Sequence, residues 1–299
     1  MRAFVLALVL GATYAVVGSA YLTARADTEH SNLYLRRVGG SSAHRIPTAN
    51  DPYAFALDPT WSPDGKRIAF TYGVCDDCPG DISTIDVHGR HRREFTDAVG
   101  SRPVWAPDGR SITFVTTGQA IASLDLKSGR TSPLINAGST SLDYPAWSPD
   151  GSRLAYSRQV APDNWDIFVW VPSTGRTTRL VHAAHSDIEP SWSRDGRWIA
   201  YVTQLSSMRF AVSAIRANGT GDHVVTRGKG GAQVPSWSPD GRSLSYVSVR
   251  PGKPQSLWVV RADGRRPRRL TKPNLTVISA HWAPRGDRIV FSARTAAAS

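Results

Sequence analysis

The chain has 299 residues, of which 40% are hydrophobic and 9% aromatic, and it carries 36 Lys and Arg against 24 Asp and Glu. This apolar content excludes a disordered or collagen-like chain. Two cysteines are too few for a disulfide scaffold or a four-cysteine zinc site. The formal net charge of +12 favours anionic partners or surfaces, and length alone predicts about two domains.

Residues 1–26 have the order of a secretory signal peptide. Arg2 precedes an apolar stretch, and small residues then allow cleavage after Ala20 or after Ala26. The alternative is an uncleaved membrane anchor, because the apolar residues 3–21 approach the roughly 20 that a membrane span needs. Either way we expect the rest of the chain to be exported, to the periplasm, the cell envelope or the medium.

One phrase built on Trp-Ser-Pro-Asp-Gly recurs six times, at intervals of 42–45 residues. The copies begin at Trp61, Trp105, Trp147, Trp192, Trp237 and Trp282. Such regular spacing is the signature of an internal structural repeat. The six equivalent tryptophans are therefore expected to pack between repeats rather than to bind a ligand.

Each phrase precedes a short apolar segment of period two, such as residues 68–70, which predicts a strand after a Pro-Asp-Gly hairpin turn. A third strand, such as residues 81–87, and a fourth, such as residues 268–271, complete the unit. Four strands in 42–45 residues are typical of a propeller blade.

The two ends of the chain complement each other. The sixth unit stops after its second strand, whereas residues 32–40 and 45–48 have the pattern of a third and a fourth strand. The prediction is an all-β fold: a single six-bladed β-propeller of four-stranded antiparallel blades over residues 30–299. Strands from both ends close the last blade and remove its open edges.

The Trp-Ser-Pro-Asp-Gly phrase, followed by a basic residue and an aromatic-ended strand, resembles the WD40-like repeat of the TolB-type β-propeller proteins. The resemblance covers about residues 30–295. It implies the propeller fold but is weak for function, because these repeats recur in periplasmic binding proteins, peptidase propellers and some lyases.

Function is expected where the repeats differ, on the loops of one face. This variable face carries the second-to-third strand loops and the connections between blades, such as residues 96–103, around the central channel. The candidate binding residues there are Asp143, Tyr144, Trp165, His182, His185, Asp187, Glu189, Arg227 and Lys229. The opposite, hairpin-turn face collects much of the basic charge, including Lys66, Arg90, Arg110, Arg176, Arg265 and Arg269.

Residues 182–189 hold two His, one Asp and one Glu, which are ligand types for a metal ion. An acidic residue before Pro-x-Trp recurs at residues 143–145, however, so the pattern is expected to belong to the repeat. No second cluster completes a metal site, and no cofactor is expected. Cys75 and Cys78 are expected to form a local disulfide, as suits an exported chain.

These features favour a non-catalytic, monomeric scaffold that binds an envelope protein or an anionic envelope polymer or lipid surface, and not nucleic acid. The sequence contains no Gly-x-Ser-x-Gly, His-Glu-x-x-His or phosphate-loop motif. Two alternatives remain. One is a propeller lyase or hydrolase with its site at the channel mouth, involving His182 to Glu189; the other is an extracytoplasmic sensor domain on a membrane anchor.

Overall fold

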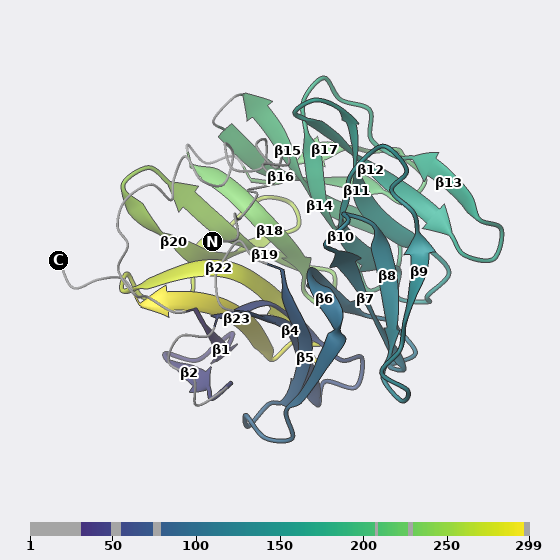
Figure 1. The fold of residues 1–299 in the computed structure, drawn as a ribbon. Helices are drawn as coiled ribbons and strands as arrows, with labels where there is room; N and C mark the ends of the chain where they lie inside the picture. The colour runs from purple at the N-terminus through teal and green to yellow at the C-terminus, as the bar shows by residue number, and fades with distance from the viewer. Residues whose placement is uncertain (1–30, 49–54, 74–78, 207–208, 227–229, 296–299) are drawn as a thin grey trace, which may run out of the picture.

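The computed structural model describes residues 31–48, 55–73, 79–206, 209–226 and 230–295 (Figure 1). All regular elements in these ranges are strands, and every strand pair is antiparallel, which confirms the all-β prediction. The predicted signal, the predicted disulfide between Cys75 and Cys78, and the candidate residues Arg227 and Lys229 lie outside the described residues.

Three repeats each form one four-stranded sheet. In these sheets the strands follow one another in chain order. The first contains β10 (Leu142–Trp147), β11 (Leu154–Ala161), β12 (Asn164–Val171) and β13 (Arg176–Arg179). The second contains β14 (Asp187–Trp192), β15 (Trp198–Ser206), β16 (Arg209–Arg216) and β17 (His223–Val224). The third contains β18 (Gly231–Trp237), β19 (Ser243–Arg250), β20 (Lys253–Arg261) and β21 (Arg268–Arg269).

The first two repeats share one strand and so form a seven-stranded sheet. Its strands are β3 (Phe55–Trp61), β4 (Arg67–Gly73), β5 (Gly80–Asp86), β6 (Arg93–Trp105), β7 (Ser111–Thr116), β8 (Ile121–Asp125) and β9 (Thr131–Ile135). The beginning of β6 pairs with β5, and its end, from Gly100 to Trp105, pairs with β7. Residues 96–103 were expected to be a loop; they are instead the middle of this continuous strand.

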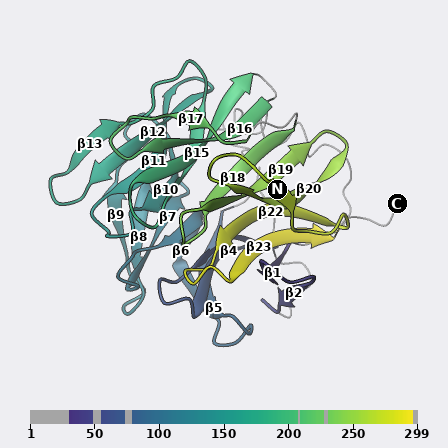
Figure 2. The same cartoon turned by 180° about the vertical axis from the view of Figure 1, so that it is seen from behind.

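Strands from both ends of the chain form the remaining sheet, in the order β2 (Ala43–Ile46), β1 (Asn32–Arg37), β23 (Arg288–Thr295) and β22 (Leu275–Trp282). The pairing of β1 with β23 runs in unbroken register from Asn32 opposite Ala293 to Arg37 opposite Arg288. Figures 1 and 2 show the purple and yellow ends of the chain side by side in this sheet.

The first strand of each repeat lies next to the first strands of the neighbouring repeats. We call β3, the end of β6, β10, β14, β18 and β22 the inner strands. Each of them contacts the inner strand before and after it in this order, and β22 contacts β3. The side chains that project from the inner strands are therefore brought together from separate repeats.

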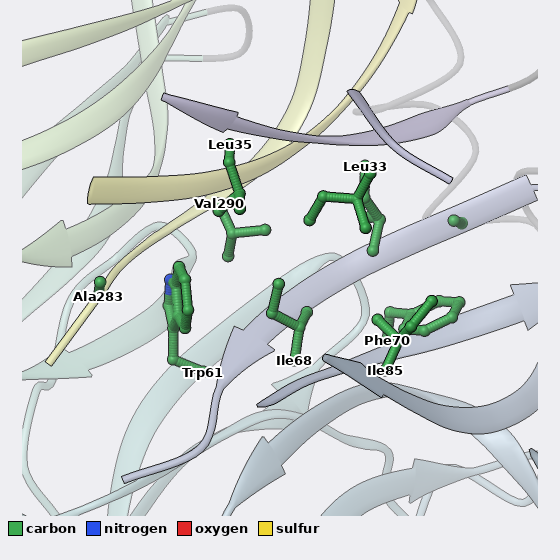
Figure 3. Packing of buried hydrophobic residues seen from close by; sticks show 10 residues of the cluster. Leu33, Leu35, Trp61, Ile68, Phe70, Ile85, Ala283 and Val290 are labelled. Atoms are coloured by element: carbon green, nitrogen blue, oxygen red, sulfur yellow. The ribbon is translucent and has the colours of Figure 1, made fainter. Parts of the chain in front are cut away.

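The repeated tryptophans connect neighbouring sheets. Trp61 is 4% exposed and packs with Ile68 of its own repeat and with Ala283 and Val290 of the sheet of chain ends (Figure 3). Its Nε1 donates a hydrogen bond to the carbonyl oxygen of His281 at 3.2 Å. Equivalent bonds run from Trp147 to Thr113 Oγ1 at 2.9 Å and from Trp192 to the Ala146 carbonyl at 3.1 Å.

Proline and glycine of the repeated turn also make contact from one repeat to the next. A Cβ atom placed on Gly65 would lie 3.8 Å from Cδ of Pro284, the proline of the preceding copy around the molecule. The same arrangement joins Gly109 to Pro63, Gly151 to Pro107, Gly196 to Pro149 and Gly286 to Pro239. Gly241 has no such neighbour, because the copy before it carries Arg194 in place of proline.

We expect Arg194→Pro to stabilise the protein by about 0.4–1 kcal/mol. Proline restricts the unfolded chain, and the other five copies show that this turn position accepts it. The measurement is the midpoint of denaturant unfolding at an unchanged slope. Pro149→Arg is the matched control and should lower the midpoint, because it removes the restriction that proline places on the unfolded chain at an equivalent turn. A lower midpoint for Arg194→Pro would show that this turn differs from its five counterparts.

Candidate functional site

All six inner strands have a register shift a few residues before the tryptophan, and in five of them the residue three places before the tryptophan has a positive φ angle. The bulge residues have positive φ angles: Asp58 (49°), Arg102 (53°), Tyr144 (50°), Glu189 (59°) and Val234 (54°). Each precedes a proline, which disfavours the right-handed helical conformation for the residue before it. Ser279, the sixth counterpart, precedes Ala280 and is not among the residues with positive φ in the described chain.

These bulges hold non-glycine residues in a left-handed conformation, which costs of order 1–3 kcal/mol for each sparsely populated backbone state. Bulges re-aim side chains and are over-represented next to functional sites. The bulge residues of neighbouring inner strands are therefore the first place to look for a site.

Arg102 links three inner strands through its guanidinium group. Its Nε lies 2.6 Å from Oδ1 of Asp143 on β10, and its Nη1 lies 3.9 Å from Oδ2 of Asp58 on β3. The guanidinium carbon also lies 3.8 Å from the ring centroid of Tyr144, in cation–π geometry. A single cation thus contacts two carboxylates from different repeats, Asp58 and Asp143, and the aromatic ring of Tyr144.

Glu189 extends this group to the next two inner strands. Its carboxylate accepts a hydrogen bond from the backbone N–H of Val234 on β18 and interacts with the Tyr144 side chain. Burial raises the pKa of Glu189 to about 6, whereas the Val234 N–H and the Arg102 charge act in the opposite direction. We call Asp58, Arg102, Asp143, Tyr144 and Glu189 the inner-strand network.

The inner-strand network contains more acidic than basic groups. Three carboxyl groups face one guanidinium, and burial raises the pKa of Asp143 although Arg102 opposes this shift. The Asp143 side chain is 13% exposed and that of Asp58 is 23% exposed, so both can be reached by a ligand. Such a site suits a cation or a donor of several hydrogen bonds.

A second group of acids lies beside this network, at the beginning of β12 and β14. Asp166 and Asp187 are both fully buried, and Asp166 forms an ion pair with Arg179. Burial raises the pKa of Asp187 to about 7; the charges of Asp166 and Asp222 add to the rise and the Thr203 side chain opposes it. Asp187 therefore titrates near neutral pH.

We expect the stability difference between wild type and Asp187→Asn to depend on pH. The pKa of Asp187 is raised on folding, so the native state binds more protons than the unfolded state from about pH 4 to about pH 7. The contribution of Asp187 to the free energy of unfolding is thus present at low pH and is lost as pH rises through 7. Urea unfolding at pH 5 and pH 8 should show a smaller pH-dependent loss in Asp187→Asn.

Asp150→Asn is the matched control for this pH experiment. The hydrogen bond from Ser148 Oγ, followed by those from Ser152, holds the pKa of Asp150 at about 2. This carboxyl group is ionised at both pH values, so its replacement should cost the same free energy at pH 5 and pH 8. An Asp187→Asn profile parallel to that of wild type would contradict the assignment.

The structure brings some of the predicted site residues together and separates others. Asp143, Tyr144 and Glu189 meet in the inner-strand network, and Trp165 is buried in a cluster against which Tyr144 packs. His182 and His185 are exposed. Within the described ranges, no three His, Cys, Asp or Glu side chains are grouped closely enough to hold a metal ion.

Two residues of the inner-strand network, Asp58 and Arg102, were not among the predicted site residues. Aligning the six repeats places both at the position three residues before the tryptophan, together with Tyr144 and Glu189. That position varies from copy to copy although it is followed by proline in five of them. Variation inside an otherwise constant phrase is the sequence signal that could have found them.

We expect Arg102→Met to destabilise the fold by about 1–3 kcal/mol, because Asp143 would be left partly buried without its charged partner. It should also raise the pKa of Asp143 further. Chemical denaturation measures the first effect and carboxyl NMR titration the second. Arg110→Met, at an exposed turn position, is the control and should change neither quantity. Equal effects of the two replacements would exclude a central role for Arg102.

Comparison with known proteins agrees with this architecture. Residues 101–209 match the family model described as the TolB beta propeller domain. The chain carries the TolB-type propeller repeat. This confirms the resemblance seen in the repeated phrase. No curated protein sequence matches the chain.

Solved structures share the fold of this chain at low sequence identity. Putative TolB from Agrobacterium tumefaciens is 20% identical, with a TM-score of 0.72 over 90% of this chain and 99% of its own. TolB from Acinetobacter baumannii is also 20% identical, with a TM-score of 0.64 over 89% of this chain and 64% of its own. An oligogalacturonate lyase in complex with manganese is 16% identical, with a TM-score of 0.58 over 87% and 77%.

These similarities show that TolB proteins and enzymes share this fold. The fold alone therefore does not identify the function of this chain. Among the residues that the structure describes, no helix has the length and apolar character needed to cross a membrane.

Proposed function

We propose that residues 30–299 form one closed six-bladed propeller. The supporting observations are the three four-stranded sheets, the seven-stranded sheet in which two repeats share β6, and the sheet of chain ends. The contact between β22 and β3 supports closure, because it brings the inner strands of the last and first repeats together. The inner strands would then line a central channel.

We further propose that this propeller is an exported, non-catalytic scaffold that binds a protein segment in the cell envelope. The inner-strand network is the observation that carries this proposal. Five bulged residues are held in a strained conformation. The side chains of four of them, together with Asp143, form a partly exposed group with an excess of carboxylates, and the backbone N–H of the fifth, Val234, connects this group to a fifth inner strand. A scaffold that needed only stability would gain nothing from this strain.

The network lies toward the variable face. Asp143 is the second residue of β10 and Glu189 the third residue of β14, so both lie near the end of the channel where the connections between blades enter. An extended segment with a basic side chain and free N–H groups would complement the excess of carboxylates there. The signal-like order of residues 1–26 supports export to the compartment where such a partner would be met.

A propeller enzyme is the second candidate function. The observation in its favour is Glu189, whose pKa is raised to about 6 beside the Tyr144 side chain, since perturbed carboxyl groups cluster at catalytic sites. The fold is shared with a manganese-containing oligogalacturonate lyase. Metal analysis of purified protein discriminates between the candidates: a stoichiometric ion that is lost in Glu189→Gln would favour the enzyme.

Site-specific photo-crosslinking in the envelope tests the scaffold proposal. A crosslinker at exposed Ala161, the last residue of β11 before the β11–β12 connection on the variable face, should give a discrete adduct. The matched position is exposed Ser173, in the β12–β13 turn at the other end of the same sheet, where we expect none. Asp143→Asn should weaken the adduct at position 161, because it removes a carboxylate that the partner contacts.

Two results would overturn this assignment. Adducts of equal yield at positions 161 and 173 would show contact without a preferred face. An adduct that Asp143→Asn and Glu189→Gln both leave unchanged would show that the partner binds loops alone and not the inner-strand network.

A further inference from the structure

A cavity of about 400 Å³ lies on the hairpin-turn face and is formed by residues other than those of the inner-strand network. It is formed where the β22–β23 turn of the last repeat meets the β3–β4 turn and the residues after β5 in the first repeat. Its lining residues are Asp64, Gly65, Lys66, Asp86, Val87, His88, Arg285 and Arg288. The cavity therefore lies where the last repeat meets the first.

Arg285 in this cavity differs from the residue at the same position of the other repeated turns. In the other five copies this position is aspartate, whose Oδ1 accepts a hydrogen bond from the backbone N–H two residues later. The donors are Lys66 (3.0 Å), Arg110 (2.9 Å), Ser152 (3.1 Å), Arg197 (3.1 Å) and Arg242 (3.1 Å). An arginine cannot accept this bond, so the sixth turn gives up a local stabilising interaction.

The two acidic side chains of the cavity already accept hydrogen bonds within their own turns. Asp64 accepts hydrogen bonds from Ser62 Oγ at 2.7 Å and from the Lys66 backbone N–H at 3.0 Å. Asp86 accepts the backbone N–H groups of His88 and Arg90, both at 2.8 Å. These carboxylates hold the walls of the cavity in shape and are partly neutralised by the donors around them.

The cations of the cavity are placed differently. Lys66 and Arg285 are exposed, whereas Arg288, which also lines the cavity, is partly buried. The Arg288 Nε lies 3.2 Å from Asp287 Oδ2, and its guanidinium lies 5.6 Å from the Trp61 ring. Three cationic side chains from two repeats thus surround one concave space, and two of them are guanidinium groups, which bind phosphate in a bidentate manner.

We propose that this cavity binds a small phosphate-bearing ligand through Lys66, Arg285 and Arg288. Its volume suits a small molecule. The carboxylate of Asp64, whose printed bonds use Oδ1, would accept a hydrogen bond through Oδ2 from a hydroxyl group next to the phosphate, as in a phosphorylated polyol. Because the ligand would bridge the first and last repeats, its binding stabilises the folded chain against unfolding.

Thermal unfolding of the full protein tests this proposal, with inorganic phosphate and glycerol 3-phosphate as probes. Chloride at equal ionic strength and glycerol are the reference additions. Both phosphate probes should raise Tm in a saturable manner, glycerol 3-phosphate at lower concentration, and chloride and glycerol should not. Flotation with anionic phospholipid vesicles forms the separate arm for a lipid headgroup: binding there that inorganic phosphate displaces assigns the same site to a membrane source.

Arg285→Asp is the decisive variant, because it restores the residue of the other five copies and is expected to fold. It should raise Tm without ligand and weaken phosphate binding at least tenfold. Lys66→Ser, which borrows the residue of the third repeat, should weaken binding independently. Arg265→Asp is the matched control: it makes the same charge reversal at an exposed turn residue outside the cavity.

The proposal fails if phosphate does not shift Tm of the wild type beyond the effect of chloride. It also fails if Arg285→Asp and Arg265→Asp reduce the phosphate effect equally, since binding would then follow net charge and not this cavity. Neither outcome bears on the inner-strand network, whose test uses different residues on the other face.

Discussion

The pairing of β1 with β23 is the interaction on which the rest of the arrangement depends. It supplies the last repeat with two strands that its own end of the chain lacks, and it occupies an edge that would otherwise be open to other chains. It also brings the last inner strand against the first, so that Trp61 reaches the His281 carbonyl. The phosphate cavity that we propose lies at this same junction.

The constant residues of the repeated phrase stabilise the fold, and its variable residues form the candidate sites. Its constant residues make contacts from one repeat to the next: tryptophan packs on the neighbouring sheet, and proline lies against the next glycine. The variable positions supply the polar and charged side chains of the two candidate sites. The residue three places before tryptophan builds the inner-strand network, and the one copy with arginine in place of the turn aspartate faces the cavity. Each exception gives up local stability, which is the pattern expected of functional positions.

The strands and turns could be predicted because they depend on local chemistry: alternating apolar residues, a Pro-Asp-Gly turn and regular spacing. Part of the candidate site was predictable too, since Asp143, Tyr144 and Glu189 precede the repeated tryptophans. Arg102 was missed although residues 96–103 had been placed on the variable face, because no local feature of the sequence shows that β6 continues through them and carries Arg102 to carboxylates of two other repeats. His182 and His185 were grouped with Asp187 and Glu189 by sequence proximity alone. The chain leaves the histidines exposed and turns the acids inward on β14.

The sequence by itself determined the repeat, its four strands, the TolB-type resemblance and the basic character of the chain. These properties are local or additive, and each copy of the phrase specifies them again. Only the tertiary structure decided which side chains of different repeats meet, because that depends on bulges and on contacts between residues more than 40 positions apart. The sharing of β6, the Arg102 ion pairs and the junction cavity are of this kind. The sequence gives only the net charge of +12, whereas the tertiary structure places three of the cationic side chains around one cavity.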